Sequence, residues 1–159
     1  MNDLKVSPHH SADVAKHKWY PCNHDGHIGR GVKREDGKWR VQYLHQFVWV
    51  LEHGRLPAAP MSIDHSNNDP SDNRIDNLRP ATKRLQCLNR GKAEVVLPKG
   101  VKQAGTKYAA RLDGRVIGRF DTVDEASIAY QSALEAAIED EVKKSWELFH
   151  KEEKSDVQG

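Results

Sequence analysis

The chain contains 159 residues, 37% of them hydrophobic and 30% charged. This length allows one ordinary domain or two small ones, and the composition is typical of folded, water-soluble proteins. No apolar run is long enough to cross a bilayer, and residues 1–10 lack the apolar core of a secretion signal, which predicts an intracellular protein without a membrane partner. The two cysteines, Cys22 and Cys87, belong to no CxxC pair, which excludes a disulfide framework and a four-cysteine zinc site.

The formal net charge is only +2, but the charges are unevenly distributed. The segment from Glu135 to Asp156 is rich in acidic residues, so the rest of the chain is more basic than the total suggests. A basic body is what a phosphate-binding surface requires, and nucleic acid is therefore a candidate partner.

The N-terminal part of the chain predicts an arm followed by a small sheet. Residues 1–18 mix polar, His and Lys side chains without apolar periodicity, which predicts a mobile arm. Between residues 18 and 43, two Asp-Gly dipeptides separate short aromatic and apolar runs, and residues 38–43 alternate polar and apolar side chains. Tight turns and a period of two predict a small antiparallel ribbon.

The middle of the chain predicts the order helix, strand, loop, helix. Apolar residues at helical spacing, followed by a glycine, predict a helix over residues 44–53. Residues 61–65 come after two prolines and predict a short strand, and the polar run over residues 66–73 predicts a loop. Thr82 is a suitable N-cap for a helix over residues 83–89.

The C-terminal part predicts a second α+β pattern. Three short strands are predicted, with an Asp-Gly dipeptide between the last two: residues 100–103, 107–113 and 115–120. Thr122 and Glu125 form a T-x-x-E capping box at the start of a long helix, whose apolar stripe runs from Ala126 to Ile138. The stripe can continue through Trp146 and Phe149 toward the acidic tail.

Together these patterns predict an α+β protein with two modules. The expected boundaries are an N-terminal arm at residues 1–18, a first module at 19–91, a linker at 92–98, a second module at 99–140, and a helix extension with an acidic tail at 141–159.

The first module concentrates residues that can hydrolyse a phosphodiester. One acid, one imidazole and several amides lie in a short stretch: Asp64, His65, Asn73, Asn77, Gln86 and Asn89. A carboxylate and amide oxygens are hard ligands suited to Mg²⁺ or Mn²⁺, and a neutral imidazole can take a proton from water near neutral pH. Neighbouring side chains on a regular strand point to opposite faces, so Asp64 and His65 should diverge unless the strand end is distorted.

Residues 38–91 resemble the phage-type HNH homing endonucleases, which are built on a strand, loop and helix frame. The resemblance lies in motifs that arrive in the family's order: His45-Gln46-Phe47-Val48-Trp49, Gly54-Arg55-Leu56-Pro57, Ile63-Asp64-His65, the run from Asn73 to Leu78, and Thr82.

The resemblance implies roles for individual residues. His65 would be the general base, Asp64 a ligand of a single divalent metal, Mg²⁺ or Mn²⁺, and Asn77 would orient the imidazole through its amide. The family's remaining ligand is an asparagine where this chain has Gln86, and Asn89 lies three residues further on nearly the same helix face, so the second ligand stays open between these two. No zinc is expected. Asn73 is interpreted as a residue that caps a turn.

The implied reaction is metal-assisted hydrolysis of DNA that leaves a 5′ phosphate and a 3′ hydroxyl. One metal and one histidine per chain cut one strand, so a monomer is expected to nick, and a double-strand break would require a dimer or two sequential events. The expected state is a monomer or a weak dimer. The resemblance also implies a phage-encoded protein in the cytoplasm of a host cell. Because Gln86 replaces the expected asparagine, a DNA-binding regulator with a degenerate nuclease site is the alternative, and an enzyme acting on RNA is a third reading.

The second module, from about residue 98 to 138, resembles the apetala-two/ethylene-response-factor type of DNA-binding domain. The resemblance lies in Gly100-Val101, the run from Lys107 to Arg111, the run from Gly118 to Thr122, and the run from Glu125 to Tyr130. It implies that a three-stranded sheet reads double-stranded DNA in the major groove while the helix packs behind it. A sheet and helix module that binds another protein is the alternative.

Alternation along the middle strand divides its side chains between two faces. Tyr108, Ala110 and Leu112 are predicted to face the helix, which turns Arg111 toward DNA as the candidate base-reading residue. The remaining predicted DNA contacts are cations, most of them expected to bind phosphates: Lys99, Lys102, Lys107, Arg115 and Arg119. The side on which Arg115 and Arg119 lie stays open, because Ile117 has the same parity and is expected in the core.

Overall fold

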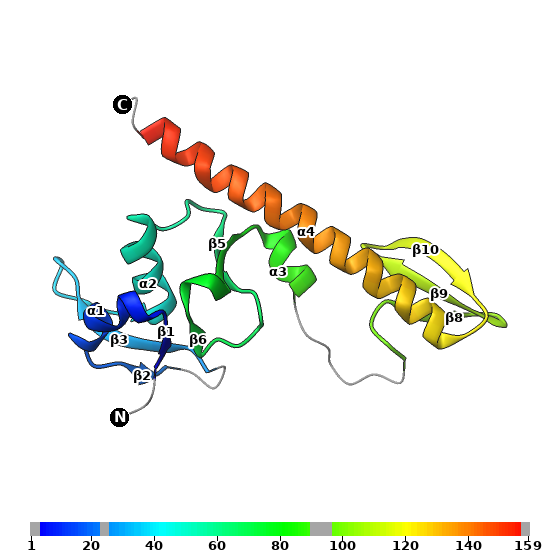
Figure 1. The fold of residues 1–159 in the computed structure, drawn as a ribbon, viewed down its shortest axis with the longest axis horizontal. Helices are drawn as coiled ribbons and strands as arrows, with labels where there is room; N and C mark the ends of the chain where they lie inside the picture. Colours follow the sequence, from blue (N-terminus) through cyan, green and yellow to red (C-terminus); the bar gives the residue numbers. More distant parts are fainter. Residues whose placement is uncertain (1–3, 23–25, 90–96, 157–159) are drawn as a thin grey trace. The chain divides into compact units, whose positions relative to one another are not determined.

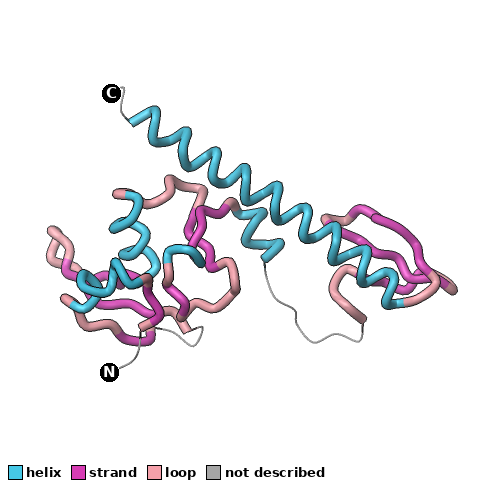
Figure 2. The backbone as a smooth tube through the Cα atoms, in the orientation of Figure 1, coloured by secondary structure: helices cyan, strands magenta, loops and turns pink. Residues whose placement is uncertain are grey.

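The structure is a computed structural model that describes residues 4–22, 26–89 and 97–156 (Figure 1). The chain forms two compact units, one within residues 1–83 and 145–159 and the other within residues 84–144. Helices, antiparallel sheets and long loops are mixed throughout, as the α+β prediction requires (Figure 2). None of the helices in the described part of the chain is both long and apolar enough to span a bilayer.

The first unit contains the predicted antiparallel ribbon. It is a three-stranded sheet in the order β2 (Tyr20–Pro21), β3 (Ile28–Lys33) and β4 (Trp39–Tyr43). Five residue pairs join β3 to β4, and the turn between them contains Gly37 at φ +80°, a conformation that glycine adopts without strain.

Helix α2 (Leu44–His53) begins where β4 ends and has the bounds that its apolar spacing predicts. Gly54, at φ +75°, ends the helix in the left-handed conformation. Its buried apolar residues are Leu44, Val48 and Trp49, which form the core of the first unit with Val14, Leu78 and Phe149.

A two-stranded antiparallel sheet follows, made of β5 (Ser62–His65) and β7 (Leu78–Ala81). Between these strands lie the short strand β6 (Asp72–Asn73) and the 3-10 helix η2 (Ile75–Asn77). The sequence patterns did not predict β7. Pro80 cannot donate a backbone hydrogen bond and argues against a central strand, but it is tolerated here because the sheet has only two strands and both have an outer edge.

The N-terminal residues differ from the expected mobile arm. Residues 4–18 contain β1 (Lys5–Val6), the 3-10 helix η1 (Pro8–His10) and α1 (Ser11–Ala15), and β1 pairs in parallel with β6. The segment is held mainly by Val14, which is 2% exposed, and by Ser7, whose hydroxyl accepts a hydrogen bond from the backbone of Ile75 at 2.9 Å. Isolated contacts of this kind leave no periodic pattern in the sequence.

The second unit contains most of α3 (Lys83–Asn89), from Arg84 on, and the sheet β8 (Val101–Ala104), β9 (Lys107–Leu112) and β10 (Arg115–Phe120). The strands are antiparallel with β9 in the centre. Their small core is formed by Val101, Ala110, Ala126 and Tyr130. Residues 92–96 of the predicted linker lie outside the described residues.

Helix α4 (Val123–Asp156) begins at the predicted capping box. The Thr122 backbone donates to the Glu125 carboxylate and the Glu125 backbone donates to the Thr122 hydroxyl, each at 3.2 Å. Its last turns belong to the first unit, where the Trp49 ring lies 5.4 Å from Phe149. Arg55 also donates to the Phe149 carbonyl at 2.6 Å. The extension expected at residues 141–159 is therefore, as far as it is described, a continuous helix.

Candidate active site

The loop between β5 and β7 is closed by the side chain of Asn77. The Asn77 amide nitrogen donates to the Asp72 carbonyl at 2.8 Å and to the Asn67 side-chain oxygen at 3.0 Å. The Asn77 amide oxygen accepts from the Asn67 backbone at 3.1 Å. Because these three bonds cross the loop, Asn77 fixes the path of the chain between the two strands.

Asp72 anchors the other side of this loop. Its carboxylate is 3% exposed and accepts hydrogen bonds from Arg74 at 2.6 and 2.8 Å and from the Asn67 amide at 3.0 Å. The Arg74 guanidinium is the main reason why the pKa of Asp72 lies below its ordinary value. A buried, ionised Asp72 holds β6 in place, and β6 carries Asn73 as its next residue.

His65 is the last residue of β5 and is only 7% exposed. Its Nε2 lies 3.5 Å from the side-chain oxygen of Asn73, which is fully buried. The Asn73 amide nitrogen donates to the Ser71 carbonyl at 2.9 Å, so the amide oxygen is the group that faces the imidazole. An oxygen can only accept, and this contact therefore favours the tautomer with the proton on Nε2 and the lone pair on Nδ1.

Two further histidines stand against His65. Its ring centroid lies 5.2 Å from that of His45 and 5.8 Å from that of His27, and Tyr43 stacks on His45 at 5.5 Å. Burial lowers the pKa of His45 to about 3 and also lowers the pKa of His65 below its ordinary value of 6.5. At neutral pH, His45 and His65 are therefore uncharged, as a proton acceptor must be.

The side chains of Asp64 and His65 project from opposite faces of β5, because the pairing with β7 is regular through both residues. Its cross-strand partner is Arg79, whose Nε and Nη2 donate to the same carboxylate oxygen, Oδ2, at 3.1 and 2.9 Å. Both side chains are largely buried, at 15% and 11% exposure. Arg79 thus compensates the charge of Asp64 and fixes the carboxylate.

The two candidate second ligands, Gln86 and Asn89, lie on α3 in the part of the chain that belongs to the second unit. Sequence reasoning missed three residues of the site. Arg79 is recognised as part of the site only from the pairing of β5 with β7, and His27 only from its ring contact with His65. Asn73 was interpreted as a turn cap, but its side chain faces His65.

Another group of ligand atoms lies at the far end of α2. His9 and His10 each place Nε2 at 3.1 Å from one oxygen of Glu52, and within the described ranges this is the group of His, Cys, Asp and Glu whose geometry could hold an ion. Glu52 lies seven residues after His45 on the same helix, a separation of about 10 Å along the helix axis. This group is therefore distinct from the surroundings of His65.

In the second unit, the outer face of the sheet carries most of the predicted DNA-binding cations. Lys107 and Arg111 point away from the helix with Ala109, and the registers place Lys102 and Arg119 opposite Ala109. A bulge between Val116 and Gly118 shifts the register and brings Arg119 to this face, whereas Arg115 pairs with Leu112. Ile117, expected in the core, is 42% exposed because of the same bulge.

A comparison with known protein families matches the middle of the chain. The model of the HNH endonuclease family matches residues 42–86, the segment that contains α2, β5, β7 and most of α3. This match supports a nuclease of the HNH type with a DNA substrate, and nucleases of this type use a divalent metal. The comparisons with curated proteins and with solved structures return no match.

Proposed function

We propose that the protein is a metal-dependent DNA endonuclease that hydrolyses a phosphodiester to a 5′ phosphate and a 3′ hydroxyl. The observation that carries the proposal is His65, a buried, neutral imidazole oriented by Asn73 within the segment that matches the HNH endonucleases. A general base must be unprotonated near the working pH and must present a defined nitrogen, and His65 meets both conditions.

In this mechanism, His65 accepts a proton at Nδ1 from the water that attacks the phosphorus. The contact with the Asn73 oxygen keeps Nε2 protonated, so that Nδ1 carries the lone pair that accepts the proton from water. Asn77 acts through the backbone by closing the loop that carries Asn73. The orientation of the imidazole by Asn77, which the resemblance implies, would in this geometry be indirect.

The residues present are chemically suited to a hard divalent ion such as Mg²⁺ or Mn²⁺. Asp64 would supply the carboxylate ligand, and Gln86 or Asn89 is the amide ligand that the resemblance implies. When bound, such an ion stabilises negative charge on the phosphate and on the departing oxygen.

The second unit supplies DNA recognition in this proposal. Its outer face presents Lys102, Lys107, Arg111 and Arg119, which supports binding of the sheet to duplex DNA in the manner of apetala-two domains. A monomer with one base would nick one strand of a specific target, as a homing enzyme does. If the chain is phage-encoded, it would act in the cytoplasm of the host cell.

The test is cleavage of supercoiled plasmid DNA by the purified protein with Mg²⁺ or Mn²⁺ and with a chelator. We expect conversion to nicked circles only with metal, and ligation of the nicks by DNA ligase without prior end repair, because ligase requires a 5′ phosphate and a 3′ hydroxyl. Cleavage that persists with the chelator, or nicks that ligase cannot close, would contradict the proposed chemistry.

The ion pair between Arg79 and Asp64 favours a second candidate, a DNA-binding regulator whose nuclease site has decayed. A guanidinium held against the expected metal ligand competes with a cation for the same charge. Calorimetric titration with Mn²⁺ separates the two functions. If DNA binding is intact while Mn²⁺ binds no better to the wild type than to the Asp64→Asn variant, the regulator is the correct assignment.

A further inference from the structure

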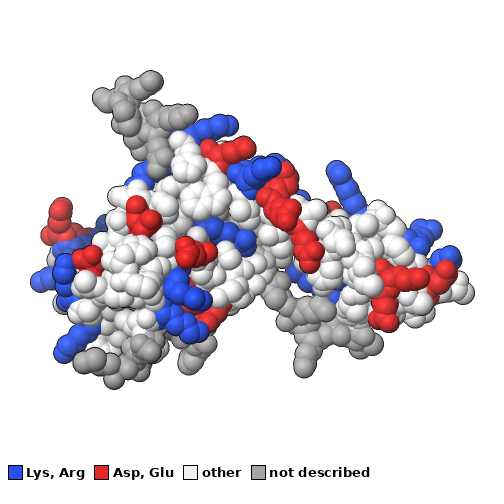
Figure 3. All heavy atoms as spheres, in the orientation of Figure 1, with Lys and Arg blue, Asp and Glu red and all other residues white. Residues whose placement is uncertain are grey.

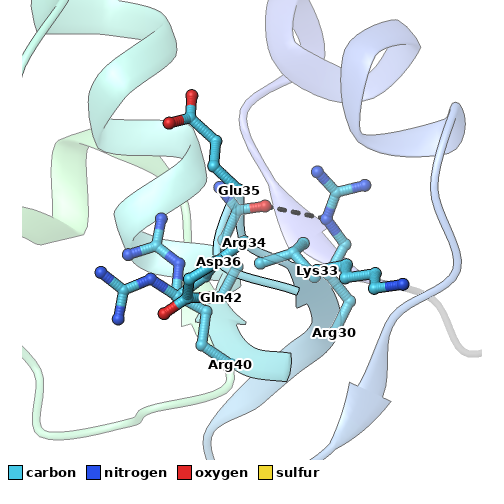
Figure 4. A pocket seen from close by; sticks show the side chains of 8 residues that line it. Arg30, Lys33, Arg34, Glu35, Asp36, Arg40 and Gln42 are labelled. Atoms are coloured by element: carbon cyan, nitrogen blue, oxygen red, sulfur yellow. Dashed lines mark hydrogen bonds between the residues drawn. The ribbon is translucent and has the colours of Figure 1, made fainter. Parts of the chain in front are cut away.

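The hairpin of β3 and β4 contains a hollow of about 590 Å³ (Figure 4). Four of the residues that line it are cations and two are acids, so the lining has a net charge of +2: Arg30, Lys33, Arg34 and Arg40 against Glu35 and Asp36. Figure 3 shows Lys and Arg atoms, with a few acidic atoms among them, on the left side of the first unit. We call these four cations the hairpin cluster.

The register of the hairpin brings two of these arginines to one face. Val32 pairs with Arg40, and the Arg34 backbone donates to the Lys38 carbonyl at 2.8 Å, so Arg34 and Arg40 share the face of Val32. Figure 4 shows their guanidinium groups pointing to the same side, while Lys33 points to the other. Arg30 lies on the same face by register, but its guanidinium packs over the rings of Trp19 and Phe47, and its Nε donates to the Gln42 side chain at 2.8 Å.

The exposed cations of the hairpin cluster form no ion pair with the described residues of the protein. Elsewhere in the first unit the arginines are paired with carboxylates, as Arg55, Arg74 and Arg79 show. Among the residues that the structure describes, no carboxylate lies within ion-pair distance of Lys33, Arg34 or Arg40. Glu35 and Asp36 compensate these cations only in part, and a phosphate that binds between them reduces the remaining repulsion.

The hairpin leads directly to the candidate active site. Strand β4 ends at Tyr43, whose ring lies 5.5 Å from His45 and 5.7 Å from His27, and both of these rings contact His65. Arg40 precedes Tyr43 by three residues, about 10 Å along the strand, and alternation places the two side chains on opposite faces of the hairpin.

We infer that the hairpin cluster is a binding site for the phosphate backbone of duplex DNA beside the bond that is cleaved. This inference rests on the proposed nuclease function and adds a contact that the first unit makes itself. Such contacts hold the scissile phosphate near His65 and carry no base information, so the loss of affinity on mutation is the same for every sequence.

The test measures binding of a fluorescein-labelled duplex of mixed sequence as a function of salt, with plasmid cleavage followed in the same samples. The variant Arg34→Gln/Arg40→Gln removes two cations of the hairpin cluster. The matched control, Lys16→Gln/Lys144→Gln, removes two exposed cations that form surface ion pairs with Asp13 and Asp140. Both double variants lose the same net charge, and thermal melting checks that each is folded.

Each phosphate contact contributes about 0.9 to the slope of log affinity against log salt, so we expect the hairpin variant to lose nearly 2 from this slope. Near 0.1 M salt, binding should weaken between about ten- and a hundredfold. The control should keep the wild-type slope, and Arg34→Lys/Arg40→Lys should restore most of it. If the hairpin variant has the same salt slope as the control, the inference is wrong, but the proposed nuclease function is not affected. A wild type that neither binds the duplex nor cuts the plasmid overturns the nuclease proposal and the inference together.

Discussion

Burial of His45 should make the stability of the protein depend on pH in the mildly acidic range. Its ring is 8% exposed, its Nδ1 has no hydrogen-bond partner within the described structure, and its pKa is lowered to about 3 from 6.5. Between pH 3 and pH 6.5, His45 is protonated in the unfolded chain but stays neutral in the folded protein. The contribution of neutral His45 is therefore fully present above pH 6.5 and is lost as the pH falls toward 3.

The size of the effect follows from the linkage relation, in which one proton changes the unfolding free energy by about 1.36 kcal/mol per pH unit. When the pH falls from 6.5 to 5, His45 alone should lower the free energy of unfolding by about 2 kcal/mol. The variant His45→Phe keeps an aromatic ring against Tyr43 but cannot titrate. Its free energy of unfolding should therefore fall by about 2 kcal/mol less than that of the wild type between pH 7 and pH 5. Urea unfolding at several pH values, followed by tryptophan fluorescence, measures this difference.

A residual pH dependence is expected in His45→Phe, because burial also lowers the pKa values of His10 and His65. Equal losses of stability in the wild type and His45→Phe between pH 7 and pH 5 would refute the argument from burial.

Three further substitutions test the site and the second unit. Asn73→Ala should lower cleavage by up to about a hundredfold with DNA affinity unchanged, because the imidazole of His65 loses its orienting partner, and steady-state rates measured beside binding isotherms check this. Thr122→Ala removes one bond of the capping box at α4 and should destabilise the protein by about 1 kcal/mol in urea unfolding. Gly100→Ala should cost at least about 2 kcal/mol in the same assay, because Gly100 has φ +78° and an added Cβ would collide with the Tyr130 ring. A stability change below a few tenths of a kcal/mol in either of the last two variants would contradict the contacts described.

Much of the fold could be predicted from the sequence because its signals are local. The bounds of α2 follow from apolar spacing and a left-handed glycine, and the start of α4 follows from a capping box of two residues. The parts that local patterns do not predict depend on pairing between distant segments. Strand β7 is recognisable only beside β5, and β1 only beside β6, since neither has a periodic pattern of its own.

The candidate site divides in the same way. Asp64 and His65 are adjacent in the sequence and could be singled out by residue type. The residues around them could not be predicted from the sequence. Strand pairing brings Arg79 to Asp64. The loop that Asn77 closes turns Asn73 toward His65. The bulge in β10 likewise decides that Arg119 joins the outer face, a shift of one residue that alternation alone cannot predict.

The most direct test of the central claim is the rate of plasmid nicking by His65→Gln, compared with the wild type at equal occupancy of DNA and metal. Glutamine retains a polar side chain of similar reach but cannot accept a proton near neutral pH. If His65 is the general base, the rate should fall by a factor of about 10² to 10⁴ while the affinities for DNA and Mn²⁺ stay at their wild-type values. A variant that nicks at the wild-type rate would contradict the assignment of His65 and the mechanism built on it.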